Sequence, residues 1–91
     1  MKTRNPIQLQ TTSIGLSFEL DPVGGYYPEQ GPCIIVFDGN FEVGCYSLQM
    51  LESMGGGVCI TSGEFEKYRA IEAHDLARLC AEARTILEGA K

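Results

Sequence analysis

The four cysteines and the single histidine of this 91-residue chain are its residues with the widest chemistry. A thiolate beside an imidazole makes a nucleophile, and thiolates with histidines make a zinc site. No two cysteines have the CxxC spacing of common zinc motifs, and one histidine is too few for them. We therefore expect no metal ion and no other cofactor. The cysteines are Cys33, Cys45, Cys59 and Cys80.

A catalytic pair with His74 has little support from spacing. His74 and Asp75 are neighbours on a predicted helix, where adjacent side chains diverge by about 100°, so we expect them not to pair. Cys80 lies six residues further along the same helix, too far for a hydrogen bond to His74. We predict no catalytic residue and no enzymatic activity. An enzyme with a site centred on Cys59, brought to His74 by the fold, remains an alternative.

Charge is distributed unevenly along the chain, whose formal net charge is -5. No lysine or arginine lies between Arg4 and Lys67. That interval carries eight acids: Glu19, Asp21, Glu29, Asp38, Glu42, Glu52, Glu64 and Glu66. A surface of one sign steers a basic partner and repels nucleic acid. We expect a protein partner with a basic surface and no direct binding to nucleic acid, although the acids are also explained by solubility alone.

Two adjacent tyrosines in a glycine- and proline-rich loop add an aromatic element to this acidic region. Tyrosines beside acids are typical of protein-binding patches, although packing of one of them at the core edge is an equal alternative. The residues that we predict to contact the partner are Asp21, Tyr26, Tyr27, Glu29, Asp38, Glu42, Glu64 and Glu66.

Strands are predicted to position these acids. Residues 12–20 alternate between apolar and polar types, which places Ile14, Leu16, Phe18 and Leu20 on one buried face. Residues 33–46 read as a hairpin with a three-residue loop, Asp38-Gly39-Asn40.

That loop would pair Phe37 with Phe41, Ile35 with Val43 and Cys33 with Cys45, all on the buried face. A two-residue turn would shift the register and bury Glu42. Cys33 opposite Cys45 would permit a disulfide, but we prefer reduced thiols in the core.

The C-terminal half predicts more helix. A stripe of apolar residues between 74 and 88 predicts an amphipathic helix: Leu76, Leu79, Cys80, Ala83, Ile86 and Leu87. Residues 58–61 read as a strand, whereas residues 47–54 fit a helix or an extension of the preceding strand. Residues 64–72 also fit either state, and we prefer a strand that leads into the helix.

Together these elements predict a small α+β domain spanning residues 1–91, with a flexible segment at residues 1–8. An antiparallel sheet of three to five strands would pack against a C-terminal amphipathic helix. No segment resembles a signal peptide or a membrane span, so we expect a cytoplasmic protein without membrane contacts.

The function that we expect is protein binding, by an inhibitor or adaptor that docks on nucleic-acid-handling machinery. Phage-encoded inhibitors of host defence systems include small acidic α+β proteins, which is an analogy of class and not of motif. A homodimeric structural subunit without a separate partner is the alternative, so the chain is expected to be a monomer or a homodimer.

Overall fold

The computed structural model describes residues 6–23, 31–54, 58–62 and 67–89, and for residues 58–62 and 67–69 only the backbone. Four antiparallel strands form one sheet in the order β1-β2-β3-β4, and two further strands form a separate hairpin, β5-β6. The strands are β1 (Ile7–Gln8), β2 (Leu16–Asp21), β3 (Cys33–Asp38), β4 (Phe41–Ser47), β5 (Val58–Ser62) and β6 (Lys67–Ile71). The helices are α1 (Leu48–Met54) and α2 (Ala73–Gly89).

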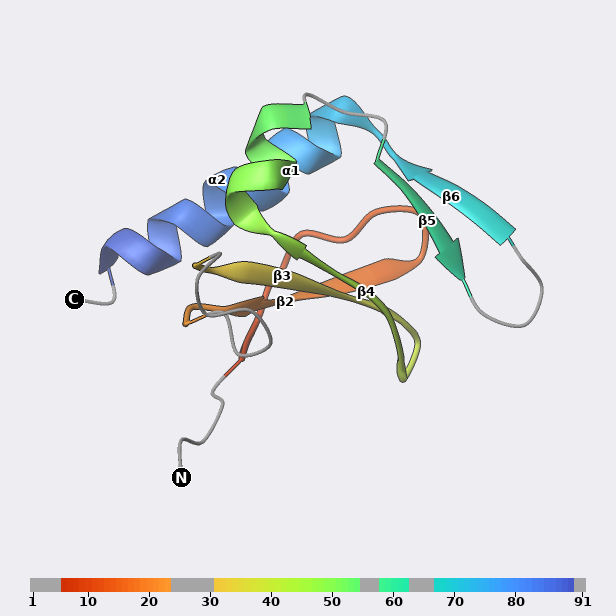
Figure 1. Ribbon diagram of the computed structural model, residues 1–91, viewed down its shortest axis with the longest axis horizontal. Helices are drawn as coiled ribbons and strands as arrows, with labels where there is room; N and C mark the ends of the chain where they lie inside the picture. Colours follow the sequence, from red (N-terminus) through yellow and green to blue (C-terminus); the bar gives the residue numbers. More distant parts are fainter. Residues whose placement is uncertain (1–5, 24–30, 55–57, 63–66, 90–91) are drawn as a thin grey trace.

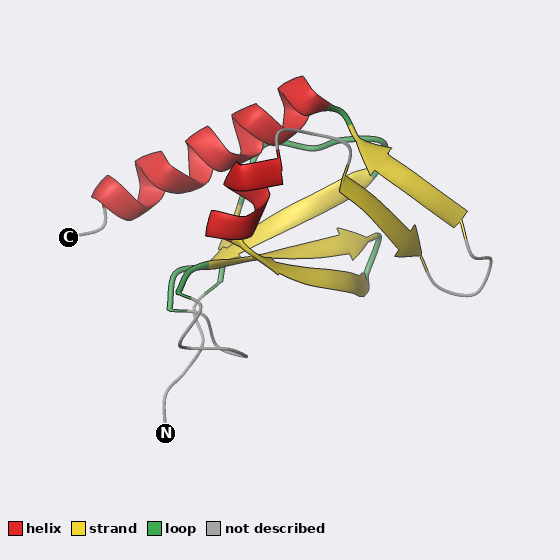
Figure 2. Cartoon of the chain, turned by 45° about the horizontal axis from the view of Figure 1, so that its top comes forward, coloured by secondary structure: helices red, strands yellow, loops and turns green. Residues whose placement is uncertain are grey.

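Both helices lie on the same side of the four-stranded sheet, and the β5-β6 hairpin stands beside them (Figures 1 and 2). The core lies between the helices and this inner face of the sheet, and its sheet side is built from Leu16, Phe18, Leu20, Ile34 and Val36. Leu48 and Leu51 of α1 close it, together with Leu76, Leu79, Cys80 and Ala83 of α2. The predicted α+β fold is confirmed.

The strand predicted for residues 12–20 is correct in its second half and wrong in its first. Leu16, Phe18 and Leu20 are buried, but Ile14 is exposed and lies in a tight turn between Ser13 and Leu16. Ile14 and Gly15 have φ values of 48° and 79°, as in the type I′ turns that join hairpin strands. Alternation alone did not predict this turn, because Ile14 is a β-branched residue that rarely adopts a positive φ.

The β3-β4 hairpin differs from the prediction in both register and face. Asp38 pairs with Phe41 across a two-residue turn, and the register shifts after Val36, which leaves Val43 as an extra residue in β4. The extra residue at the bulge offsets the one-residue shift in register that the shorter turn causes. Glu42 therefore pairs with Phe37 and stays exposed. Ile34 and Val36 face the core.

Cys45 pairs with Ile35 and not with Cys33, and both side chains lie on the opposite, outer face. The predicted placement of Cys33, Ile35, Phe37, Phe41, Val43 and Cys45 on one core face is therefore wrong, although Val43 still packs at the core edge.

The C-terminal predictions agree with the structure. Residues 48–54 form a helix, residues 58–62 a strand, and residues 67–71 a strand that leads into α2. The predicted stripe of α2 is buried at Leu76, Leu79, Cys80 and Ala83, and Ile86 and Leu87 pack at its edge. Residues 64–66, part of the segment that fitted either state, lie outside the described residues.

The N-terminal segment is partly ordered, in contrast to the prediction for residues 1–8. Ile7 and Gln8 form β1 by pairing with Leu20 and Glu19. Among the described residues, no helix has the length and apolarity needed to cross a membrane.

Candidate functional site

The outer face of the sheet and the turn end of the β3-β4 hairpin carry the predicted acidic residues that the structure describes. Side chains alternate along each strand, so the residues between the core positions point to the outer face. The outer face is formed by Gln8, Ser17, Glu19, Asp21, Cys33, Ile35, Phe37, Glu42, Cys45 and Ser47. It therefore mixes acids with apolar side chains.

The three predicted acids that the structure describes differ in their solvent exposure. Glu42 is exposed and Asp38 is half-buried, and both lie at the turn end of the hairpin. Asp21 is only 1% exposed, and its Oδ1 accepts a hydrogen bond from the Val23 amide at 3.2 Å. The prediction that Asp21 displays its charge to a partner is wrong, because the side chain is enclosed at the end of β2. Glu19, which was not in the predicted set, is a half-buried acid of the outer face.

The other predicted contact residues lie outside the described residues: Tyr26, Tyr27, Glu29, Glu64 and Glu66. Of the predicted set, Asp38 and Glu42 lie at the same end of the β3-β4 hairpin, on opposite faces of the sheet.

Phe41 is the residue of this region that the sequence analysis missed. It directly follows the Gly39-Asn40 turn and is 77% exposed, although the predicted register placed it in the core. Asp38 is its cross-strand partner and Glu42 is its neighbour in the chain. Aromatic residues are enriched among the anchors of protein interfaces, so an exposed ring at a hairpin turn that also carries two acids is a candidate contact for a basic partner.

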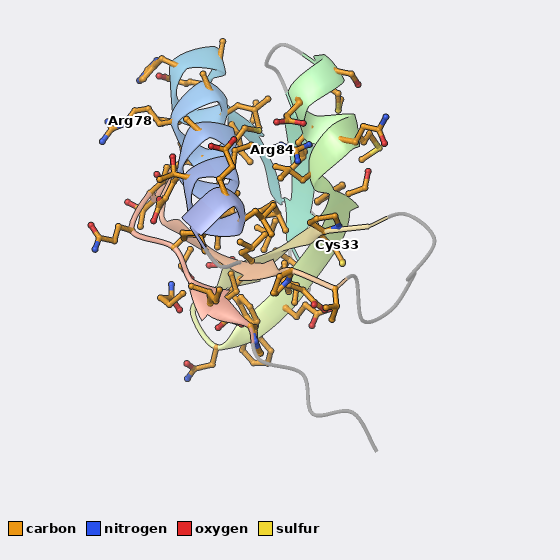
Figure 3. The ribbon with its side chains drawn as sticks, turned by 90° about the vertical axis from the view of Figure 1, so that its left-hand side faces the viewer. Cys33, Arg78 and Arg84 are labelled. Atoms are coloured by element: carbon orange, nitrogen blue, oxygen red, sulfur yellow. The ribbon has the colours of Figure 1, made fainter. Side chains whose placement is uncertain are left out.

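The described arginines lie on the helical side of the molecule. Arg84 projects from α2 toward α1, whereas Arg78 points away from α1 (Figure 3). Arg84 donates two hydrogen bonds to the Glu52 carboxylate, at 2.8 and 2.7 Å. These bonds hold the pKa of Glu52 below its ordinary value. Arg84 is thus paired within the helical layer, and the outer face carries no arginine or lysine among the described side chains.

Cys33 and Cys45 lie close together on the outer face. Burial raises the pKa of both thiols, and that of Cys45 reaches about 11. The neighbouring Cys33 raises the pKa of Cys45 further, whereas Cys45 lowers the pKa of Cys33, and the charge of Asp21 raises both. Both groups are therefore neutral thiols at pH 7, and neither is an activated nucleophile.

The only histidine takes part in a different cluster, at the start of α2. His74 Nδ1 lies 3.4 Å from Glu72 Oε2, and His74 Nε2 lies 3.3 Å from Asp75 Oδ1. The expectation that His74 and Asp75 do not pair is wrong, because at the start of α2 the imidazole lies within 3.3 Å of the Asp75 carboxylate. The three side chains place ligand atoms within 4.8 Å of one another, a spacing that a metal ion could bridge.

This cluster is better explained as a group of polar contacts at the surface. His74 and Glu72 are 69% and 63% exposed, so water competes with these contacts. The remaining oxygen of Asp75 accepts a hydrogen bond from the buried Ser13 hydroxyl at 2.9 Å, which ties the 13–16 turn to α2. Cys80 is buried in the core, and the side chain of Cys59 lies outside the described part of the chain. A Cys59–His74 site has no support from the described atoms.

A shallow hollow of about 180 Å³ lies between the two helices. Its walls are mostly apolar, and Met50 and Met54 of α1 are 42% and 48% exposed. The lining residues are Leu51, Glu52, Ala73, Leu76, Ala77 and Cys80. The hollow has room for one side chain, and among the described residues it holds no group arranged for catalysis.

Comparison with protein-family models, with curated proteins and with solved structures finds no significant match to this chain.

Proposed function

We propose that this protein is a non-catalytic binding module that docks the turn end of the β3-β4 hairpin onto a basic surface of another protein. The observation that carries the proposal is Phe41, which is 77% exposed, pairs with Asp38 across the hairpin and precedes Glu42 in the chain. A large apolar ring in water gains free energy when a partner covers it, and aromatic anchors account for much of the energy of many interfaces.

The acids around Phe41 favour a cationic partner. Asp38 is the cross-strand partner of Phe41, whereas Glu42 and Glu19 lie on the outer face of the sheet. Complementary charge mainly raises the rate of encounter and selects the partner, while the aromatic contact slows dissociation. Lysines and arginines of the partner would surround Phe41 and stack on its ring.

Proteins that handle nucleic acids carry such basic surfaces because they must neutralise phosphates. A module that covers one of these surfaces would inhibit nucleic-acid binding by its partner. This mode of action would suit an anti-defence protein of the kind found in phages, where blocking the host's nucleic-acid-binding site suffices.

The test is affinity capture from cell extract on the immobilised protein, followed by measurement of Kd with each purified partner. Phe41→Ala is expected to weaken binding about 30-fold, because a central aromatic anchor contributes about 2 kcal/mol. Glu42→Lys is expected to weaken binding most at low salt, where charge attraction is least screened.

Glu88→Lys is the matched control, since Glu88 is an exposed acid on α2 and far from the hairpin turn in the fold. It should bind as the wild type does. A partner whose affinity is the same for wild type, Phe41→Ala and Glu42→Lys would refute docking through this hairpin. DNA that competes for the partner would identify the covered surface as its nucleic-acid site.

A further inference from the structure

Cys33 and Cys45 are neighbours on the outer face of adjacent strands. The register places Cys45 opposite Ile35, and Cys33 opposite Ser47, so the two cysteines are diagonal neighbours across β3 and β4. Both are free thiols; Cys33 is 2% exposed and Cys45 is half-buried. Cys33 lies on the sheet, well away from Arg78 on α2 (Figure 3).

The two thiols are close enough for each to influence the pKa of the other. The Cys33 thiol donates a hydrogen bond to the carbonyl oxygen of Gly31 at 3.4 Å. Diagonal residues of antiparallel strands have Cα atoms roughly 7–8 Å apart, just beyond the usual range for a disulfide. A small shift of β4 therefore suffices to bring the sulfurs to bonding distance, and the bulge at Val43 gives β4 spare backbone two residues away.

We propose that Cys33 and Cys45 form a reversible intramolecular disulfide by exchange with a small-molecule disulfide such as oxidised glutathione. The half-buried Cys45 loses its proton and attacks one sulfur of the small disulfide, which releases one thiol and leaves Cys45 in a mixed disulfide. Cys33 then loses its proton and attacks the Cys45 sulfur, which releases the second thiol. The protein loses two electrons and two protons, and the small disulfide gains them.

The surroundings of the pair indicate a disulfide that forms slowly and is easily reduced. Burial and the nearby carboxylates keep both thiols protonated at neutral pH, so the attacking thiolate is scarce and the rate rises with pH. A bond that requires a shift of β4 stores strain, and strained disulfides are reduced more readily than relaxed ones. These are properties of a redox-responsive bond and not of a permanent structural one.

The test uses the full chain with Cys59→Ser and Cys80→Ser, so that only the pair remains. The folded protein is equilibrated at about pH 8.5 in glutathione buffers of increasing oxidised fraction, quenched with acid and analysed by intact mass. We expect the loss of two hydrogens with no glutathione retained, and full reversal in reduced glutathione. With Cys33→Ser added, the reaction should stop with one glutathione bound at Cys45.

Peptide mapping of the oxidised wild-type chain provides an independent check that does not depend on the cysteine variants folding. A cross-linked peptide joining Cys33 to Cys45 is expected. Thiols that stay free in fully oxidised glutathione, a mixed disulfide that persists with both cysteines present, or closure that occurs only in urea would each overturn the proposal. So would a mapped bond between other cysteines.

Discussion

The carboxylate of Glu82 joins two parts of the molecule that are more than 70 residues apart in the chain. Its Oε2 accepts a hydrogen bond from the backbone N–H of Gln10 at 2.7 Å. Its Oε1 accepts one from the Thr11 amide at 2.9 Å and one from the Thr11 hydroxyl at 2.7 Å. One side chain of α2 thereby satisfies three donors in the segment that leads from β1 toward β2, and fixes this segment against the helix.

We expect Glu82→Gln to destabilise the fold by about 1–3 kcal/mol at pH 7, because hydrogen bonds to a charged acceptor are stronger than those to an amide. Partial burial would raise the pKa of Glu82, but the bonds from Gln10 and Thr11 outweigh it, so the pKa lies below its ordinary value of 4.5. A lowered pKa in the folded state stabilises the fold above the unfolded value, and this contribution is lost as the pH falls through the folded value.

Urea unfolding of both proteins at pH 7 and at about pH 3 measures this effect. The difference between wild type and Glu82→Gln should shrink at the lower pH, because the wild-type carboxyl is increasingly protonated as the pH falls. Glu88→Gln, on the exposed side of the same helix, should change stability little at either pH. A difference that stays constant with pH would show that the charge of Glu82 is not what holds the N-terminal segment.

Single-residue roles of this kind were poorly visible in the sequence. Glu82 is an acid on the polar side of a predicted helix, with no local pattern that sets it apart. Its partners, Gln10 and Thr11, become its neighbours only when the chain folds. Asp21 was predicted to be a surface acid because it belongs to the interval without lysine or arginine, yet the end of β2 encloses it. Phe41 was predicted to be a core residue because the three-residue loop paired it with Phe37. Residue type predicts burial on average, whereas the register of a hairpin decides it for a particular side chain.

At the scale of elements, the β3-β4 hairpin is shaped by one close contact within β4. A Cβ added to Gly44 would lie 2.7 Å from Cε2 and 3.0 Å from the hydroxyl oxygen of Tyr46. The Tyr46 ring packs at the edge of the core and covers Gly44 on the inner face of the sheet. A side chain at position 44 would therefore displace the outer end of the Tyr46 ring.

Gly44→Ala is expected to destabilise the protein by about 1–2 kcal/mol, because the ring must leave its packed position. The same substitution in a Tyr46→Leu background should cost much less, since the colliding ring is gone. Urea unfolding of the four proteins of this double-mutant cycle gives the coupling directly. Gly89→Ala, where nothing lies within 4 Å of the added carbon, is the neutral control. Additive effects at positions 44 and 46 would contradict the steric explanation.

The elements themselves were more predictable than their pairing. The apolar stripe of residues 76–87 repeats at helical spacing, and it correctly indicated which side of α2 is buried. The run from Cys33 to Phe37 is apolar at every position, so it carries no alternation to show which face meets the core. The three-residue loop was predicted because a two-residue turn would bury Glu42, but the bulge at Val43 keeps Glu42 exposed with the two-residue turn. A bulge depends on packing of the whole sheet and leaves no mark in the local pattern.

At the scale of the whole molecule, one continuous core joins the inner face of the sheet to the two helices. Leu79 of α2 is fully buried in that core, together with Phe18 of β2 and Leu48 of α1. Leu87, two turns further along the helix, is only partly buried at the edge. The helix therefore contributes to stability mainly through its first three turns.

We expect Leu79→Ala to destabilise the fold by about 2–5 kcal/mol, because the lost side chain leaves a cavity in a site that cannot collapse. For a chain of 91 residues this is a large part of a total stability of about 5–10 kcal/mol. Leu79→Met, which nearly conserves volume, should cost less than about 1.5 kcal/mol and keeps the comparison measurable if the alanine variant unfolds.

Leu87→Ala should cost about 1 kcal/mol, since its side chain is already partly exposed to water. The readout is urea unfolding followed by far-UV circular dichroism, with the slope of the transition compared between variants. Equal losses at positions 79 and 87 would mean that α2 is held along its whole length and not by a core centred on Leu79.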